Sequence, residues 1–186
     1  TAIVGEAAAA GFSVAIHAIG DGAVRNSLDA IAAHAAKLGT LPLPPRIEHV
    51  QLLDDADLPR FVTYGVGASM QPQHATTDAP VARRAWGSRC HTSYPWAALE
   101  RAGVTLAFGS DAPVEPPSVR LGLASAVARI GADGLPFEPA QAVSLDAALR
   151  AYTQGAAVLA GGRLGSGQLR VGAPADVVVW DRDLHV

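Results

Sequence analysis

Four apolar runs alternate with helix-like segments along this chain, and each run leads into polar residues that the interior of a sheet does not favour. The runs cover residues 12–17, 46–50, 66–72 and 104–111. None shows a period-two alternation of apolar and polar residues, so the pattern predicts buried strands of a parallel sheet covered by helices, an α/β fold. Short right-handed connections leave two solutions, an open doubly wound sheet or a (β/α) barrel.

The segments between and after the runs differ in how clearly they predict structure. Residues 73–93 show no clean period, and we expect them to form an irregular functional loop. Glycines punctuate residues 165–183, where we expect turns around a hairpin-like pair of strands. Apolar residues at helical spacing predict helices in the remaining segments, near residues 23–38, 54–65, 94–102, 119–130 and 145–159.

The composition excludes several classes of function. The chain has 186 residues, a net charge of −3, and 14 basic residues that are scattered rather than clustered, so we expect no nucleic-acid partner. No apolar run is long enough to span a bilayer, and we expect no membrane partner. The single cysteine, Cys90, fits a reducing compartment and predicts a cytoplasmic location. Nucleotide-loop and serine-hydrolase motifs are absent from the sequence.

Residues able to bind a metal follow the predicted strands. His17, His49, the segment from Gln71 to His74, and Asp111 come at the ends of the four runs. Because the carboxyl ends of parallel strands share one edge of a sheet, we expect these side chains to converge there. Imidazole nitrogens and a carboxylate are ligands for Zn²⁺ and similar ions, and a bound ion would activate water for hydrolysis. Taken singly, His17 could be a hydrogen-bonded structural residue and Asp111 a helix cap.

Six motifs occur in an order that is similar to a known family. They are HAIGDGAV, RIEHVQ, MQPQH, FGSDAPV, LDAALRAYTQGAA and GSGQLRVGAPADVVVWDRD. Together they resemble the C-terminal half of the YtcJ-like metal-dependent amidohydrolases, the amidohydrolase 3 group. The resemblance implies the fifth to eighth strands of a (β/α)8 TIM-type barrel in residues 1–162. It also implies that residues 163–186 are a C-terminal β segment, where the chain starts its return into a small composite β-sandwich.

The resemblance also implies roles for the residues at the strand ends. His17, His49 and Asp111 would bind one or two divalent ions, most consistent with zinc. Asp111 would also act as the catalytic base and then as the acid that protonates the leaving nitrogen. Gln73 and His74 would contact the substrate, a small molecule with an amide-type carbon–nitrogen bond that is not a peptide bond.

The family pattern is incomplete in this sequence. It contains no His-x-His pair, and its one lysine, Lys37, lies in a predicted helix. We therefore expect the missing ligands to come from an N-terminal half of the same protein, and the fragment alone to be inactive. Its unpaired sheet edges would favour association into a homo-oligomer. Two alternatives stay open: a catalytically inactive barrel that serves as a binding or structural module, and an open α/β domain with structural histidines.

Overall fold

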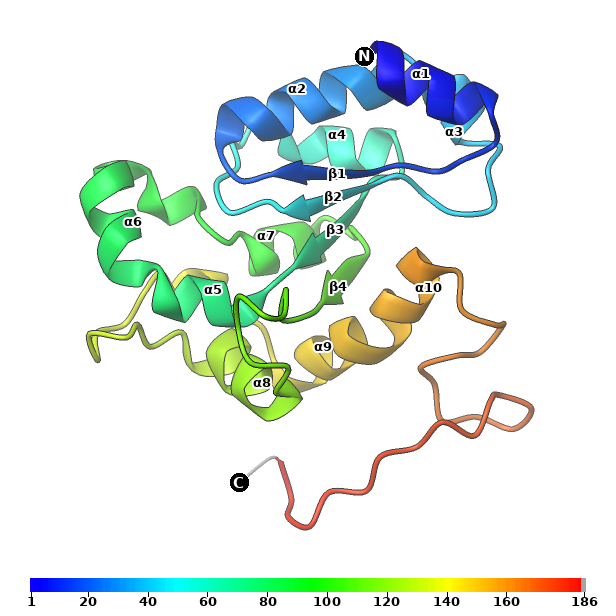
Figure 1. Ribbon diagram of the computed structural model, residues 1–186. Helices are drawn as coiled ribbons and strands as arrows, with labels where there is room; N and C mark the ends of the chain where they lie inside the picture. The colour runs from blue at the N-terminus through cyan, green and yellow to red at the C-terminus, as the bar shows by residue number, and fades with distance from the viewer. Residues whose placement is uncertain (185–186) are drawn as a thin grey trace.

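A computed structural model describes residues 1–184 of the chain and shows one four-stranded parallel sheet (Figure 1). The strands are β1 (Ala15–Ala18), β2 (Arg46–His49), β3 (Gly67–Met70) and β4 (Leu106–Phe108). They lie in the order β1-β2-β3-β4, so each strand pairs with its predecessor in the chain. The parallel α/β prediction is confirmed. The first strand begins and ends slightly later than predicted, so its histidine lies inside the strand.

The connections between the strands are helical, as predicted. The buried face of α2 is formed by Val24, Leu28 and Ile31, which follow helical spacing, and the helix packs on β1. A turn at His34 divides the predicted helix over residues 23–38 into two. The helices before β4, apart from those over residues 72–92, are α1 (Ala2–Ala9), α2 (Asp21–Ala32), α3 (Ala35–Leu38), α4 (Leu58–Thr63) and α7 (Trp96–Arg101).

The predicted loop over residues 73–93 is wrong. The chain there forms α5 (Pro72–Thr77), α6 (Ala79–Trp86) and a 3₁₀ helix, η1 (Gly87–Thr92). Proline near the start of α5 and of α6 favours helix initiation, because the amide hydrogen that proline lacks would have no partner in a first turn. The helical period is hidden because α5 buries polar as well as apolar side chains, Gln73 and His74 among them.

The second half of the chain packs helices against β4 and α5. After α8 (Val119–Ala128) and the 3₁₀ turn η2 (Pro139–Gln141), one helical run combines α9 (Leu145–Arg150), the π turn η3 (Ala151–Gly155) and α10 (Ala156–Ala160). This run confirms the helix predicted over residues 145–159. A Cβ atom at Gly155 would lie 1.8 Å from the carbonyl oxygen of Leu106, so the helix contacts β4 through backbone.

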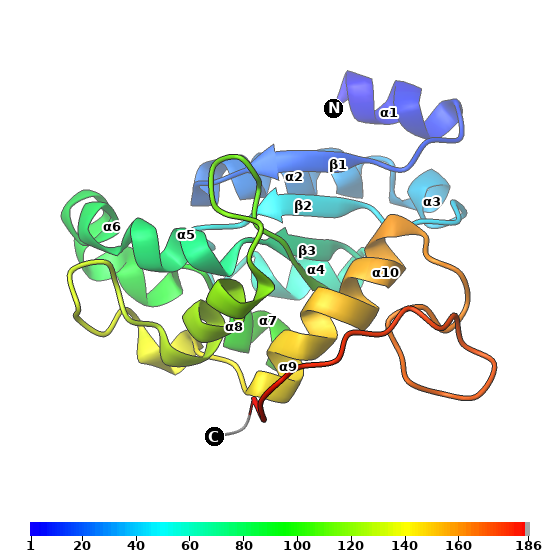
Figure 2. The ribbon, with the colours of Figure 1, turned by 60° about the horizontal axis from the view of Figure 1, so that its bottom comes forward.

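The hairpin-like strand pair predicted over residues 165–183 is also wrong. Within the described residues, the segment after α10 contains no strand and runs as an extended chain along the outside of the helices (Figure 2), with Leu184 packed against the core. Its backbone bonds are local turns, such as the one from Ala173 to Arg170, and Val177, Val178 and Val179 are exposed. An apolar run becomes a strand only when another strand offers its backbone groups, and no strand of residues 1–184 pairs with this segment.

Helices of the described residues are all too short or too polar to cross a lipid bilayer. Cys90 is buried and is not in a disulfide.

Candidate metal centre

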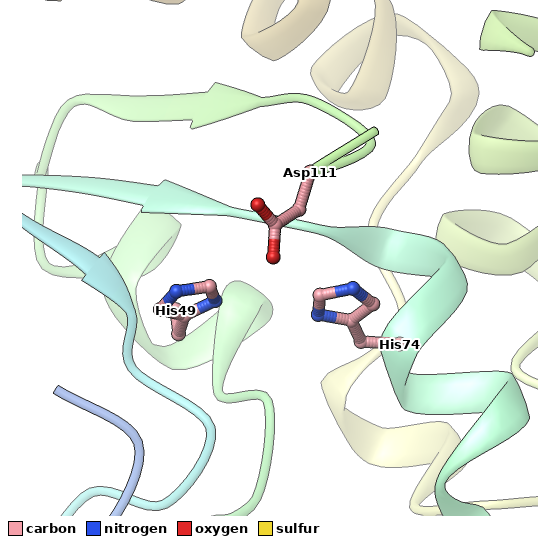
Figure 3. Close-up of side chains that lie close together, drawn as sticks. All are labelled: His49, His74 and Asp111. Atoms are coloured by element: carbon pink, nitrogen blue, oxygen red, sulfur yellow. The ribbon is translucent and has the colours of Figure 1, made fainter. Parts of the chain in front are cut away.

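Three side chains able to bind a metal converge at the carboxyl end of the sheet. His49, His74 and Asp111 each offer one ligand atom, and these atoms all lie within 4.8 Å of one another. Figure 3 shows the two imidazoles facing each other with the carboxylate of Asp111 between them. The residues come from the end of β2, the first turn of α5 and the segment after β4. Strand ends that are far apart in the sequence therefore form one site, as expected for a parallel sheet.

His49 closes β2 and is buried. Its φ is +76° and that of Val50 is +45°, so the chain turns sharply where the strand ends. The Nδ1 atom of His49 lies 2.9 Å from Oε1 of Gln71. Burial chiefly, and then the neighbouring His17, lower the pKa of His49, while the bond to Gln71 and the Asp111 carboxylate act in the opposite direction. The net effect favours the neutral imidazole, which is the form that binds metals.

His17 lies beside this group from the neighbouring strand. Its ring centroid is 4.4 Å from that of His49, with an angle of 71° between the ring planes. In the register of the sheet His17 is opposite Glu48, and its side chain is exposed at the open edge of β1. The structure thus brings His17 next to His49, but the ligand atoms that lie within 4.8 Å of one another belong to His49, His74 and Asp111 and not to His17.

His74 has a more central position than its predicted role suggested. It is 6% exposed, and its ring is nearly parallel to that of His49, with 6.0 Å between the centroids. Its Nδ1 atom lies 3.5 Å from Nε2 of Gln51, and its Nε2 atom is buried with no hydrogen-bond partner among the described residues. Because His74 follows the third predicted strand, it was expected near the site. The sequence did not show that its ring would lie among the atoms able to bind a metal.

Asp111 reaches the site from an exposed turn. Its φ is +57°, and its carbonyl oxygen accepts a bond from the amide of Val114. Gln73 ties the following segment to α5, because its Nε2 atom donates to the carbonyl oxygen of Pro116 at 2.9 Å. The hydroxyl of Thr77, also on α5, donates a second hydrogen bond to this segment, to the carboxylate of Glu115. The predicted contact of Gln73 with substrate stays a prediction. The contact that the structure shows is its hydrogen bond to Pro116, in the loop that carries Asp111.

Two further residues of the site, Gln51 and Gln71, have no separate role in the sequence-based prediction. Both are buried, and both contact an imidazole of the site. Gln71 also accepts the backbone amide of His74 at 3.1 Å, and the backbone carbonyl of Gln51 accepts the amide of Tyr94 at 2.8 Å. The available signal was a polar residue directly after each buried strand, the same signal that identified the histidines.

The residues present suit a divalent transition metal. Two imidazoles and a carboxylate form the nitrogen and oxygen set that zinc and related ions prefer. One more polar atom of the site, the buried Nε2 of His74, has no hydrogen-bond partner among the described residues. A nitrogen- and oxygen-rich site at the carboxyl edge of a parallel sheet is typical of metal-dependent hydrolases.

Comparison with known proteins agrees with this class. The chain belongs to the amidohydrolase family, whose model matches residues 1–185, and the predicted resemblance is confirmed. It is 33% identical over 177 residues to YtcJ of Bacillus subtilis (strain 168), covering 93% of this chain and 33% of that protein. It is 30% identical over 175 residues to the N-substituted formamide deformylase of Arthrobacter pascens, covering 93% of this chain and 32% of that enzyme.

A solved structure gives the same result for the fold. The crystal structure of an uncharacterized metal-dependent hydrolase from Pyrococcus horikoshii matches with a TM-score of 0.85 and 31% sequence identity. The match covers 98% of this chain and 36% of the other chain. The chain therefore spans about a third of the length of the relatives it matches.

Proposed function

We propose that this chain is the C-terminal half of a (β/α)8 barrel, strands five to eight, in a hydrolase that cleaves carbon–nitrogen bonds other than peptide bonds. The uninterrupted order β1-β2-β3-β4 supports a barrel, because a doubly wound sheet reverses its strand order at a switch point. Four strand–helix units are half of what a closed barrel needs. In this proposal residues 1–162 belong to the barrel and residues 163–186 to a β-sandwich shared with the missing N-terminal half.

His17, His49 and Asp111 would hold one or two divalent ions, with zinc as the ion that this ligand set fits best. The metal would supply an acidified water and polarise the carbonyl oxygen of the substrate. The observation that supports the proposal is the group formed by His49, His74 and Asp111 at one edge of the sheet, with His17 beside His49. The remaining ligands would come from the missing half, so the chain alone would be inactive.

Asp111 would move the proton in the reaction. Its carboxylate is exposed and lies between the imidazoles of His49 and His74, where it can reach a water held at the site (Figure 3). An aspartate there takes the proton of the attacking water and then gives it to the leaving nitrogen, so that one group serves as base and acid. Gln73 and His74, on α5, would lie on the side of the substrate.

The substrate class follows from the relatives rather than from the pocket. The enzyme from Arthrobacter pascens is named for N-substituted formamides, and we propose a small amide-type molecule for this protein. A cytoplasmic location is proposed from the single free cysteine. The open edge of β1 would pair with a strand of the missing half, or with a second copy if that half is removed.

The test uses the full-length protein. We expect it to contain a divalent metal by elemental analysis and to hydrolyse members of a panel of N-substituted formamides and other amides. Asp111→Asn should lower kcat by about a thousandfold or more, since removal of a general base and of a metal ligand combine. Asp55→Asn is the matched control, an exposed aspartate outside the site.

Two results would contradict the proposal. Unchanged turnover in Asp111→Asn would remove the assigned role of that residue. A full-length protein that binds no metal and hydrolyses no amide in the panel would favour the alternative, an inactive barrel that serves as a binding or structural module.

A further inference from the structure

Each buried imidazole of the metal centre has a glutamine at its Nδ1 atom, but the two glutamines present opposite ends of the amide. Gln71 places its carbonyl oxygen, Oε1, 2.9 Å from Nδ1 of His49. Gln51 places its amide nitrogen, Nε2, 3.5 Å from Nδ1 of His74. Both glutamines are 7% exposed, so neither exchanges this partner freely for water. The two glutamines therefore favour opposite tautomers of the two histidines.

At His49 the hydrogen must be on Nδ1. A carbonyl oxygen only accepts hydrogen bonds, so the contact at 2.9 Å requires an N–H on the imidazole. A neutral ring carries one hydrogen, and Nε2 of His49 is then left with a free lone pair. This is the usual way in which a hydrogen bond at one nitrogen prepares the other to bind a metal.

At His74 the same reasoning gives the reverse result. The amide nitrogen of Gln51 only donates, so in this contact, which is long at 3.5 Å, Nδ1 of His74 is the acceptor. The hydrogen of the neutral ring is then on Nε2, the buried atom that has no partner within residues 1–184. In this state His74 has no lone pair free for an ion, although its ring lies among the ligand-type atoms.

We infer that Gln71 and Gln51 are positioning residues that fix opposite tautomers, so that His49 binds the metal through Nε2 while His74 stays outside the coordination sphere. This inference rests on the proposed function and adds to it the division of roles between the two imidazoles. His74 is left as a ring that carries a hydrogen on Nε2 and lacks an acceptor. An oxygen-bearing substrate, such as an amide, could supply that acceptor.

Gln71 is well placed for this role because its own backbone is fixed. It precedes α5, and its carbonyl oxygen accepts the amide of His74 at 3.1 Å. One residue thus links the imidazole of His49 to the first turn of the helix that carries His74. A change at Gln71 should therefore alter how well the site holds an ion, even though Gln71 is not itself a ligand.

The experiment measures Co²⁺ affinity of the full-length protein, by competition with a chelator, together with the absorbance of the bound cobalt. Gln71→Met should lower the affinity about tenfold to hundredfold, whereas Gln71→Glu, which keeps an acceptor, should stay within about threefold of the parent. His49→Ala should lower it at least about a hundredfold. His74→Ala and Gln51→Met should leave affinity and cobalt spectrum unchanged while lowering kcat/KM. Gln168→Met, at a glutamine outside the site, controls for the substitution itself.

A second readout does not depend on metal or activity. Nitrogen-15 NMR of the metal-free protein labelled at histidine, at a pH where the rings are neutral, distinguishes the two tautomers. We expect the hydrogen on Nδ1 in His49 and on Nε2 in His74, with signals assigned by loss in the alanine variants. Circular dichroism checks that each variant is folded, and His74→Gln provides a less disruptive replacement than alanine.

The outcomes separate this inference from the proposed function. If His74→Ala and His74→Gln both lower Co²⁺ affinity as strongly as His49→Ala, His74 is a ligand and the inference is overturned while the metal site stands. The same holds if the NMR signals show one tautomer for both rings. If Gln71→Met binds Co²⁺ as tightly as the parent, Gln71 is not a positioning residue. If His49→Ala also leaves the affinity unchanged, the proposed metal site itself fails.

Discussion

Replacing Arg129 with methionine is expected to destabilise the protein by about 3 kcal/mol, because this fully buried guanidinium ties together three segments of the chain. Its Nε atom donates to the carbonyl of Phe137 at 2.9 Å. Its terminal nitrogens donate to the carbonyls of Tyr94 at 3.2 Å and Ser93 at 3.4 Å. The guanidinium carbon lies 4.3 Å from the ring centroid of Trp96, within the range of a cation–π contact.

The magnitude follows from two opposing contributions. Burial lowers the pKa of Arg129 from 12.5 to about 10, and no carboxylate within the described chain forms an ion pair with it. That shift corresponds to roughly 3 kcal/mol of desolvation cost. The three hydrogen bonds of the charged guanidinium offset this cost, since each stabilises the folded state by roughly 1.5–3 kcal/mol. Methionine removes both contributions and leaves three carbonyl groups without this donor, so the balance is a net loss on the order of 3 kcal/mol.

The assay is urea unfolding followed by tryptophan fluorescence, since Trp96 packs directly on Arg129. Arg101→Met, at an exposed arginine, should change the free energy of unfolding by no more than about 0.5 kcal/mol. Arg129→Lys should fall between the two, because lysine keeps the charge but not the planar set of donors. A loss smaller than about 1 kcal/mol in Arg129→Met would refute the reasoning.

Three further predictions concern packing, pH and metal. The hydroxyl of Tyr152 is buried and has no hydrogen-bond partner in the part of the chain that the structure describes, and burial raises its pKa to about 12. Tyr152→Phe should therefore stabilise the fold by about 1 kcal/mol at neutral pH. Because the folded state holds this proton more tightly than the unfolded state, the parent should lose stability from pH 10 to pH 12, and the phenylalanine variant should lose less, as measured by urea unfolding at each pH. Gly155→Ala should cost at least about 2 kcal/mol, because its Cβ would meet the Leu106 carbonyl; an unchanged melting temperature would contradict this contact. Removing metal from the full-length protein with a chelator should lower its Tm, and added Zn²⁺ should restore it.

The sheet was predictable because each strand carries its own signal. The runs over residues 46–50 and 104–111 carry apolar residues that a buried strand accommodates, and Pro45 and Gly103 precede them. Because the strands are parallel, their carboxyl ends lie at one edge of the sheet. His49 and Asp111, which are 62 positions apart in the sequence, could therefore be expected to lie close together. This expectation rested only on the order of the strands, and the structure does place His49 and Asp111 in one group.

The parts that were not predicted depend on contacts that the local sequence does not contain. Helix α5 buries the polar side chains of Gln73 and His74, so its sequence lacks the apolar spacing that would have predicted a helix. The run Val177–Val179 reads as a strand, but strand formation requires a neighbouring backbone that these residues do not have in the described chain. The orientation of an amide such as that of Gln71 depends on which imidazole faces it, and spacing cannot show that.

Backbone conformation at Asp111 shows how the site uses the end of a strand. Its φ of +57° costs an L-residue with a side chain roughly 1 kcal/mol, which glycine avoids. Asp111→Gly should therefore be more stable than Asp111→Ala by about 1 kcal/mol in metal-free protein, and neither should have turnover. Urea unfolding in the presence of a chelator measures the difference without a contribution from bound metal. An alanine variant as stable as the glycine variant would show that this turn is not strained; the expected order would show that aspartate is kept here for its carboxylate, at the expense of stability.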